Sequence, residues 1–247
     1  YGRTTIGILP GDTNQVNTDL VLTTTGKGRS MIAVARFEKG WDFGLNIGAS
    51  YTFQDVKDVN PVTSATPGSL YANAAMIDPN RAAYGRSIYE IRNSFKFNVD
   101  FTHAFFGDYK TRFAVFGEWH TGRPFSYTMR DPSTQRSIVF GTNVTSSNSL
   151  GLSRYLLYVP TGLDDPKVIY DSSTTASALD AFIAGGKLDK YRGQIAPKNL
   201  GTSPSSWKID LHVDQELPTF VGRSRIKVFA DIENFLNMLN SDWGVQR

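Results

Sequence analysis

The feature that most constrains the fold of this 247-residue chain is a long alternation of apolar and polar residues in Tyr89–Phe105. Its odd positions are apolar except for Asn93 and His103, while its even positions carry charged and polar side chains as far as Thr102. A period of two places successive side chains on opposite faces of a β-strand. Soluble strands usually have ~3–10 residues, whereas a strand that crosses a bilayer and projects beyond it is naturally this long.

Six further segments are predicted strands, three of them with weaker support. The stronger ones are Gly44–Gln54, Trp207–Leu217 and Ile226–Ile232, and the weaker ones are Thr18–Thr24, Arg112–His120 and Ser30–Glu38, the last of which is apolar on both faces. Three connections are short (Lys39–Asp42, Gly107–Tyr109 and Pro218–Ser224), and two are long (Asp58–Ser87 and Tyr127–Ser205). Membrane barrels have short turns on one side and long loops on the other. In the second long loop we expect a short helix at Ser172–Gly186 and a short strand at Tyr155–Val159.

Composition excludes several classes of protein. The longest apolar runs, Met31–Ala35 and Tyr155–Val159, are far shorter than the ~20 residues of a membrane-spanning helix. The balance of 26 basic and 23 acidic residues is too even for a nucleic-acid surface. With no cysteine and none of the common catalytic or nucleotide-binding motifs, we expect neither an enzyme nor a cofactor. The three histidines lack metal-ligand spacing, and Asp164-Asp165-Pro166 indicates a turn rather than a calcium loop.

Alternation by itself does not separate a soluble half-buried sheet from a membrane barrel. Loop lengths favour the barrel, as do aromatic residues near the strand ends (Tyr89, Phe105, Trp119 and Trp207). Seven strands is an odd number, whereas bacterial single-chain barrels have an even number. We therefore expect the chain to be a fragment of a longer protein. A passive porin-like channel or small closed barrel stays open, as does a soluble β-sandwich that acts as a binding or adhesion module.

Several short segments resemble one family of membrane barrels. They are Lys190–Gln194, Trp207–Leu211, Phe229–Asn237 and Leu239–Val245, with earlier matches at Gly122–Tyr127 and Leu156–Pro160. The chain resembles the C-terminal barrel part of TonB-dependent outer-membrane receptors. It is most similar to the Oar-like group, whose members carry a carboxypeptidase-regulatory-like N-terminal domain.

The resemblance implies an all-β fold: an antiparallel transmembrane β-barrel of 22 strands, with long extracellular loops and one short loop helix. Residues 1–247 would be its C-terminal part, without the plug domain, the TonB box or the final strand. The implied function is active import across a bacterial outer membrane of a ligand captured at the cell surface. The implied partners are outer-membrane lipid, the receptor's own N-terminal plug, and the TonB complex through the missing N-terminal part. The ligand stays unidentified.

Two groups of side chains are candidates for function. Polar residues at even strand positions should face the barrel lumen, because a charge facing lipid at mid-depth costs ~2–4 kcal/mol. We interpret them as cross-strand ion pairs and plug contacts rather than as substrate ligands. These residues are Lys96, Asp100, Arg112, Glu118, His120, Lys208, Asp210, His212, Asp214 and Glu216. The residues that could contact a ligand at the surface loops, with self-packing of the loop as the equal alternative, are Tyr71, Tyr84, Tyr155, Tyr158, Tyr191 and Arg192.

Overall fold

The computed structural model describes residues 2–4, 18–20, 24–60, 62–66, 70, 74–78, 81–129, 155–219, 222 and 224–240. The chain divides into two compact units, each of which is treated separately below. We call the first the loop unit; it consists of Tyr1–Arg29, Val56–Tyr89 and Pro124–Thr202. We call the second the sheet unit; it consists of Ser30–Asp55, Glu90–Arg123 and Ser203–Arg247.

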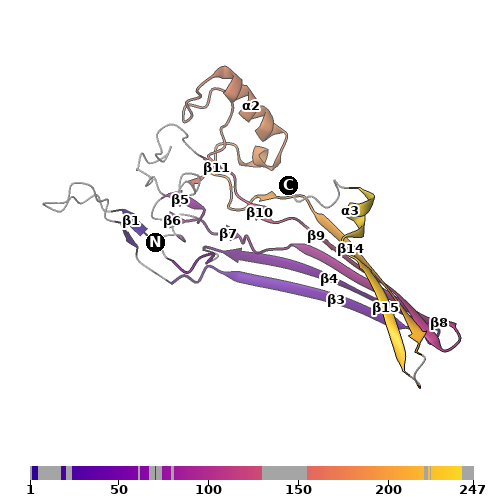
Figure 1. The fold of residues 1–247 in the computed structure, drawn as a ribbon. Helices are drawn as coiled ribbons and strands as arrows, with labels where there is room; N and C mark the ends of the chain where they lie inside the picture. Colours follow the sequence, from indigo (N-terminus) through magenta and orange to yellow (C-terminus); the bar gives the residue numbers. More distant parts are fainter. Residues whose placement is uncertain are drawn as a thin grey trace, which may run out of the picture. The chain divides into compact units, whose positions relative to one another are not determined.

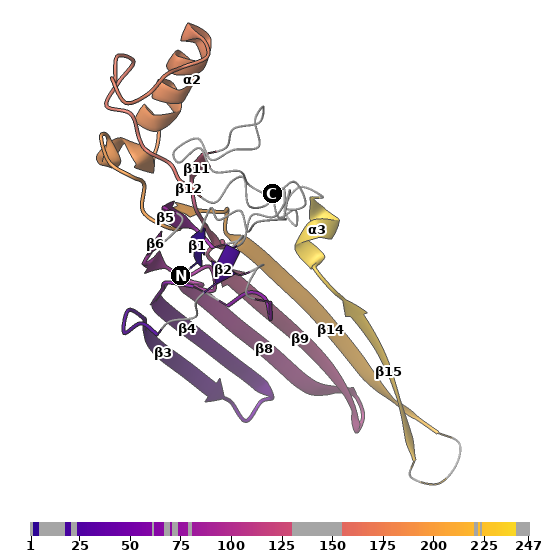
Figure 2. The ribbon, with the colours of Figure 1, turned by 90° about the vertical axis from the view of Figure 1, so that its left-hand side faces the viewer.

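The sheet unit is built on long strands that lie side by side in the order β15-β14-β9-β8-β4-β3 (Figures 1 and 2). Their bounds are β3 Arg29–Gly40, β4 Leu45–Asp58, β8 Asn93–Phe106, β9 Tyr109–His120, β14 Ser206–Pro218 and β15 Arg225–Ile232. Five of them have 12 to 14 residues, and every pairing from β4 to β15 is antiparallel. The prediction of long antiparallel strands joined by three short turns is confirmed.

Two predicted strands differ from the structure. Strand β8 begins at Asn93 rather than at Tyr89, because Ile88 and Tyr89 form a turn and pairing with β4 starts at Asn93. Within Thr18–Thr24, only β2 (Thr18–Leu20) is described as a strand. It pairs with β1 (Gly2–Thr4) in a separate two-stranded sheet, so the large sheet ends at β3 instead. This segment has only Leu20 and Leu22 as alternating apolar residues, which is a weak basis for pairing with a long strand.

The register sorts the side chains of the sheet unit into an apolar face and a polar face. One row of paired residues runs across five strands as Ile47, Val99, Val115, Leu211 and Ile232. Because side chains alternate between faces, the odd-numbered residues of β4, β8, β9 and β14 share one face with the even-numbered residues of β15. We call this the apolar face and the opposite one the polar face. A single-residue slip in any pairing would have mixed the two.

Burial in the sheet unit is the reverse of that in a soluble protein. Among its described residues no apolar side chain is buried, whereas Asp55, Glu90, Thr111 and Asp214 are buried. Large residues of the apolar face stay exposed, including Phe113 at 47% and Trp207 at 46%. Burial of apolar surface drives the folding of soluble domains in water. This unit therefore has no hydrophobic core between layers in its described part.

The loop unit, by contrast, has small apolar cores made by short elements. The strands are β5 Met76–Asp78, β6 Arg81–Ala82, β7 Gly85–Arg86, β10 Pro124–Phe125, β11 Thr128–Met129, β12 Tyr155–Leu156 and β13 Gly201–Thr202. Helix α2 (Ser173–Ala184) begins where the Ser172 hydroxyl accepts the Thr175 N–H and ends at Gly185, which confirms the predicted helix. Its buried Ile183 packs with Val159, Ala196 and Leu188, the last of which lies on the 3₁₀ helix η2 (Lys187–Tyr191).

A buried lysine secures the end of β4 within the loop unit. Lys198 is only 4% exposed, and its ammonium group pairs with the Asp58 carboxylate. The same Nζ lies 3.1 Å from the Val59 carbonyl oxygen and 3.2 Å from that of Asp58. An ammonium group has three protons to donate, and here three acceptors surround it. Burial of this charge is therefore compensated by hydrogen bonds in every direction.

After β15 the chain turns back across the sheet. Asn234 adopts a left-handed conformation with φ of 53°, and its N–H donates to Asp210 Oδ1 at 2.8 Å. Because Asp210 belongs to the polar face of β14, the short helix α3 (Phe235–Leu239) starts on that face. Nowhere in the described part of the chain is a helix long and apolar enough to cross a membrane.

Candidate functional site

The ten polar residues predicted to face a lumen all lie on the polar face of the sheet unit. The register aligns Asp100 with Ala114 and His212, and it aligns Lys96 with Glu118 and Lys208. The other predicted residues follow at intervals of two along the same strands. Their common face is therefore a structural fact, whereas the lumen in front of it stays a prediction.

Cross-strand ion pairs join several of these residues. Lys96 Nζ on β8 lies 3.3 Å from Glu118 Oε1 on β9. Arg112 Nε on β9 donates to Asp100 Oδ2 on β8 at 2.5 Å. Such pairs match the interpretation of these side chains as internal ion pairs. His120 is not among them; its Nδ1 lies 3.0 Å from the carbonyl oxygen of Thr121.

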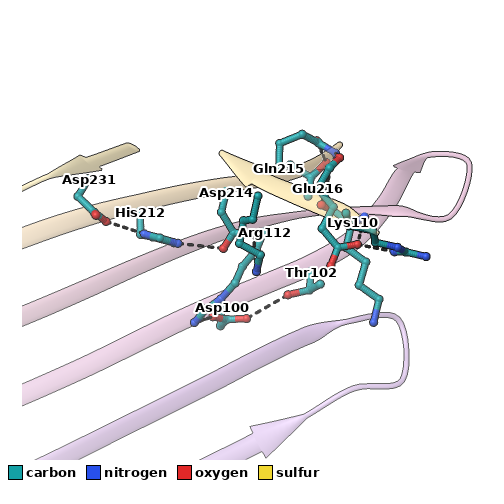
Figure 3. A network of polar contacts seen from close by, with 12 residues as sticks. Asp100, Thr102, Lys110, Arg112, His212, Asp214, Gln215, Glu216 and Asp231 are labelled. Carbon is teal, nitrogen blue, oxygen red and sulfur yellow. Dashed lines mark hydrogen bonds and ion pairs between the residues drawn. The ribbon is translucent and has the colours of Figure 1, made fainter. Parts of the chain in front are cut away.

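The densest part of the polar face is a network between β14 and β15 (Figure 3). His212 Nδ1 lies 2.5 Å from Asp231 Oδ1, and its Nε2 lies 2.9 Å from Asp214 Oδ2. Lys227 Nζ lies 3.1 Å from the other oxygen of Asp214. Nearer the turn, Glu216 accepts from Arg225 Nη1 at 2.6 Å. Asp214 is only 3% exposed, so the cost of burying its carboxylate is offset by its contacts with Lys227 and His212.

The network includes three residues of β15 that were not among the predicted site residues. They are Arg225, Lys227 and Asp231. All three lie on the polar face, because odd-numbered residues of β15 pair with even-numbered residues of β14. The alternation of Ile226, Val228, Ala230 and Ile232 already indicated that their neighbours share the opposite face. Identifying their partners required the register, which the pattern of one strand does not contain.

A pocket of about 330 Å³ opens on the polar face beside this network. It lies at the small end of the ~300–1,000 Å³ typical of ligand sites. Ala114 provides the space, since its small side chain stands between the larger Asp100 and His212 in the register. Residues that line the pocket include Asn98, Phe116, Asp210, His212, Asp231 and Glu233.

Aromatic side chains form a row across the apolar face near the end of the sheet that is opposite the short turns. Tyr51, Phe95, Trp119 and Trp207 are paired consecutively across β4, β8, β9 and β14. The Trp119 and Trp207 rings lie 6.1 Å apart between centroids. Phe105 lies ten residues after Phe95 on β8, near the short turn that joins β8 to β9. Its ring centroid is 6.5 Å from that of Phe113. The apolar face is therefore bordered by aromatic residues at both ends.

The structure gives the predicted loop residues different surroundings. Tyr71 lies outside the described residues, while Tyr84 is exposed. Tyr155 is 2% exposed and packs with Ala74 and Met76, which excludes it from a ligand surface in this conformation. Tyr191 packs against the core cluster around Ile183. These two side chains therefore serve the self-packing of the loop that was the alternative interpretation.

The remaining loop candidates are held by internal polar contacts. Arg192 Nη1 lies 2.7 Å from Asp180 Oδ1, and its Nε lies 2.8 Å from Asp189 Oδ1. The side-chain hydrogen bond to Asp189, followed by that to Asp180, raises the pKa of Arg192 above its ordinary value. The Tyr158 hydroxyl donates to Asp165 Oδ2 at 3.0 Å. In this conformation both side chains are therefore engaged in contacts within the loop unit.

Asp165 organises the turn that the sequence indicated. Its carboxylate accepts the backbone N–H groups of Thr161 at 2.8 Å and Lys167 at 2.9 Å, together with the hydroxyls of Thr161 and Tyr158. These bonds, the one from the Thr161 N–H foremost, lower the pKa of Asp165 from 3.8 to about 2. Across the described residues, no group of three acidic, His or Cys side chains is placed to hold a metal ion.

Comparisons with protein-family models, with curated proteins and with solved structures find no match to this chain.

Proposed function

We propose that this chain is the barrel portion of a TonB-dependent receptor that imports a ligand across a bacterial outer membrane. The observation that carries the membrane part of this proposal is the reversed burial of the sheet unit, with apolar side chains exposed and Asp214 buried. Lipid makes such a face favourable, because it removes apolar side chains from water without a second protein layer.

The dimensions of the apolar face agree with the thickness of a membrane. Phe95 and Phe105 are ten residues apart on β8, which corresponds to ~34 Å at ~3.4 Å per residue. At the ~40° tilt of barrel strands, this spans about 25 Å across the membrane, the height of the apolar band in outer-membrane barrels. The aromatic residues at its two borders stand where girdles contact the lipid headgroups.

The identity of the transporter rests on the sequence resemblance at Lys190–Gln194, Trp207–Leu211 and Phe229–Asn237. The proposed barrel has 22 strands and closes around an N-terminal plug, since open sheet edges are not tolerated in lipid. The two long connections, Asp58–Ser87 and Tyr127–Ser205, belong on the extracellular side, where they meet the ligand, and the short turns face the periplasm. The chain itself performs no covalent chemistry, and energy reaches the receptor through TonB.

Labelling of single cysteines in the intact protein tests the assignment of the two faces. Val99→Cys should react with a lipid-phase reagent, whereas Asn98→Cys, its neighbour on the polar face, should react only with a water-soluble one. These 247 residues contain no cysteine, so within them each label reports one position, and any cysteine elsewhere in the intact protein is first replaced by serine. Reaction of Asn98→Cys from the lipid phase, or of Val99→Cys from water alone, would contradict the membrane sheet and favour the soluble β-sandwich.

A second experiment tests active transport against passive diffusion. The intact protein should bind the C-terminal domain of TonB and should show no steady conductance in planar bilayers, because the plug fills the barrel. Stable open channels without TonB binding would favour the porin-like alternative.

Epitope tags near Thr175 and Gly222 would report the topology, with only the first accessible on intact cells.

A further inference from the structure

His212 stands between carboxylates on two neighbouring strands. Its Nδ1 faces Asp231 of β15 at 2.5 Å, and its Nε2 faces Asp214 of its own strand at 2.9 Å (Figure 3). An ionised carboxylate only accepts hydrogen bonds, so each contact needs a proton on the ring nitrogen. The imidazolium ion carries both protons, whereas neutral imidazole carries one. The two contacts can therefore both be hydrogen bonds only while His212 is charged.

The two carboxylates differ in how strongly they need this donor. Asp214 is almost completely buried and has Lys227 as its other partner, while the side chain of Asp231 is half exposed. A buried carboxylate that loses a donor is penalised more than one that water can solvate. When His212 becomes neutral, its remaining proton should therefore stay on Nε2, facing Asp214. The contact between Nδ1 and Asp231 is then the one that breaks.

Both halves of β15 pair with β14 through the backbone, but the side-chain ion pairs that reinforce the pairing differ between them. Near the turn, Arg225 pairs with Glu216 and Lys227 pairs with Asp214, and both cations keep their charge at any physiological pH. At the far end, the His212–Asp231 pair is the cross-strand ion pair between described residues of the two strands. The next attachment is the Asn234 N–H on Asp210, beyond the end of the strand. Proton loss from His212 therefore acts on one half of the strand.

The surroundings of His212 contain charges from every neighbouring strand. Arg112 is already paired with Asp100, so it does not replace His212 as a donor to Asp231. Aspartate, glutamate, lysine and arginine ordinarily change charge outside the range of pH 5 to 8, whereas histidine changes within it. The charged groups around the ring are Asp100 on β8, Arg112 on β9, Asp210 and Asp214 on β14, Lys227 and Asp231 on β15, and Glu233 beyond it.

We propose that His212 is a proton-operated latch on β15. Its charged form reinforces the backbone pairing of Phe229–Ile232 with β14, and its neutral form makes local opening of this half easier, while Arg225–Val228 keeps its ion pairs. Opening of that half would also change the wall of the pocket, since Asp231 and Ile232 line it. The inference uses only the contacts of the sheet unit and does not depend on the transport function.

Amide hydrogen exchange measured by NMR on the intact protein in detergent micelles tests the latch. The quantity to follow is the exchange rate of Phe229–Ile232 divided by that of Arg225–Val228, so that the intrinsic pH dependence of exchange largely cancels. Between pH 5 and pH 8 this ratio should rise about tenfold, as expected when one charge-assisted hydrogen bond holding a local opening is lost. A ratio that stays constant over this range would overturn the proposal.

Matched variants separate His212 from other titrating groups. His212→Gln should give the same high ratio at both pH values, while His103→Gln, which alters a histidine stacked on Phe101, should keep the tenfold response. Should His212→Gln fail to fold, Asp231→Asn removes the carboxylate instead and should likewise abolish the response. A pH response that survives in His212→Gln or in Asp231→Asn would refute the latch.

Discussion

A charge placed at the centre of the apolar face should destabilise the protein strongly, while the same charge one residue away should not. We consider Val115→Arg, which lies in the row from Ile47 to Ile232, against Ala114→Arg on the polar face. Val115 is four residues from Trp119 in the aromatic row, or ~13 Å along the strand and about 10 Å in depth at a ~40° tilt. In the proposed membrane barrel it therefore lies close to the middle of an apolar band of ~25 Å.

The expected cost follows from this depth. An arginine facing lipid near the midplane destabilises a membrane barrel by ~2–4 kcal/mol. At position 114 the arginine would enter the pocket of about 330 Å³ between Asp100 and His212, where a carboxylate can pair with it. A substitution without burial or unpaired charge usually changes stability by no more than about 0.5 kcal/mol. The two variants should therefore differ by at least ~1.5 kcal/mol, with Val115→Arg the less stable.

Reversible guanidinium unfolding of the intact protein in phospholipid vesicles measures this difference. Tryptophan fluorescence is a suitable signal, since Trp119 and Trp207 lie on the apolar face and would move from lipid to water. The midpoint of unfolding should fall for Val115→Arg at an unchanged slope, and it should stay near the natural value for Ala114→Arg. Equal costs, or a greater cost for Ala114→Arg, would refute the assignment of faces.

Three further changes test individual contacts. Lys198→Met should destabilise the loop unit by about 3–5 kcal/mol, because it leaves a carboxylate partly buried without its cation; limited proteolysis should cut this variant sooner than the exposed control Lys190→Met. The low pKa of Asp165, about 2, means that its turn is stabilised above pH ~4 and loses this contribution as the pH falls toward 2; protection of the turn amides, taken relative to the intrinsic exchange rate at each pH, should fall over that range and should stay constant in Asp165→Asn. Gly117→Ala should lower the free energy of unfolding by about 1–3 kcal/mol, because the new Cβ would stand 2.1 Å from the Phe97 ring. If this clash is the cause, Gly117→Ala should cost less when it is introduced into Phe97→Leu than into the natural chain; an equal cost in both backgrounds would reject it.

Local pattern was sufficient to predict most of the sheet unit. Alternation in Gly44–Gln54 and Arg112–His120 placed the strands, because a period of two follows from the geometry of a single extended chain. The helix at Ser172–Gly186 was equally predictable, since a serine cap and a glycine stop act through their own backbone neighbours. The grouping of charged residues such as Lys96 and Asp100 on one face follows from the same periodicity.

What tertiary structure decided was the identity of each partner. Tyr155 and Tyr84 looked alike as loop tyrosines, yet one is buried against Met76 and the other is exposed. Residues Thr18–Leu20 could have joined the large sheet, yet they pair with Gly2–Thr4.

The sequence by itself determined which side chains share a face, because that depends on the covalent geometry of one strand. It did not determine that His212 meets Asp231 or that Asp214 is buried between His212 and Lys227. Those contacts depend on the register between β14 and β15, and register is set by the pairing of backbone groups along whole strands and by the turn that joins them. The polar network therefore exists only once the strands are aligned.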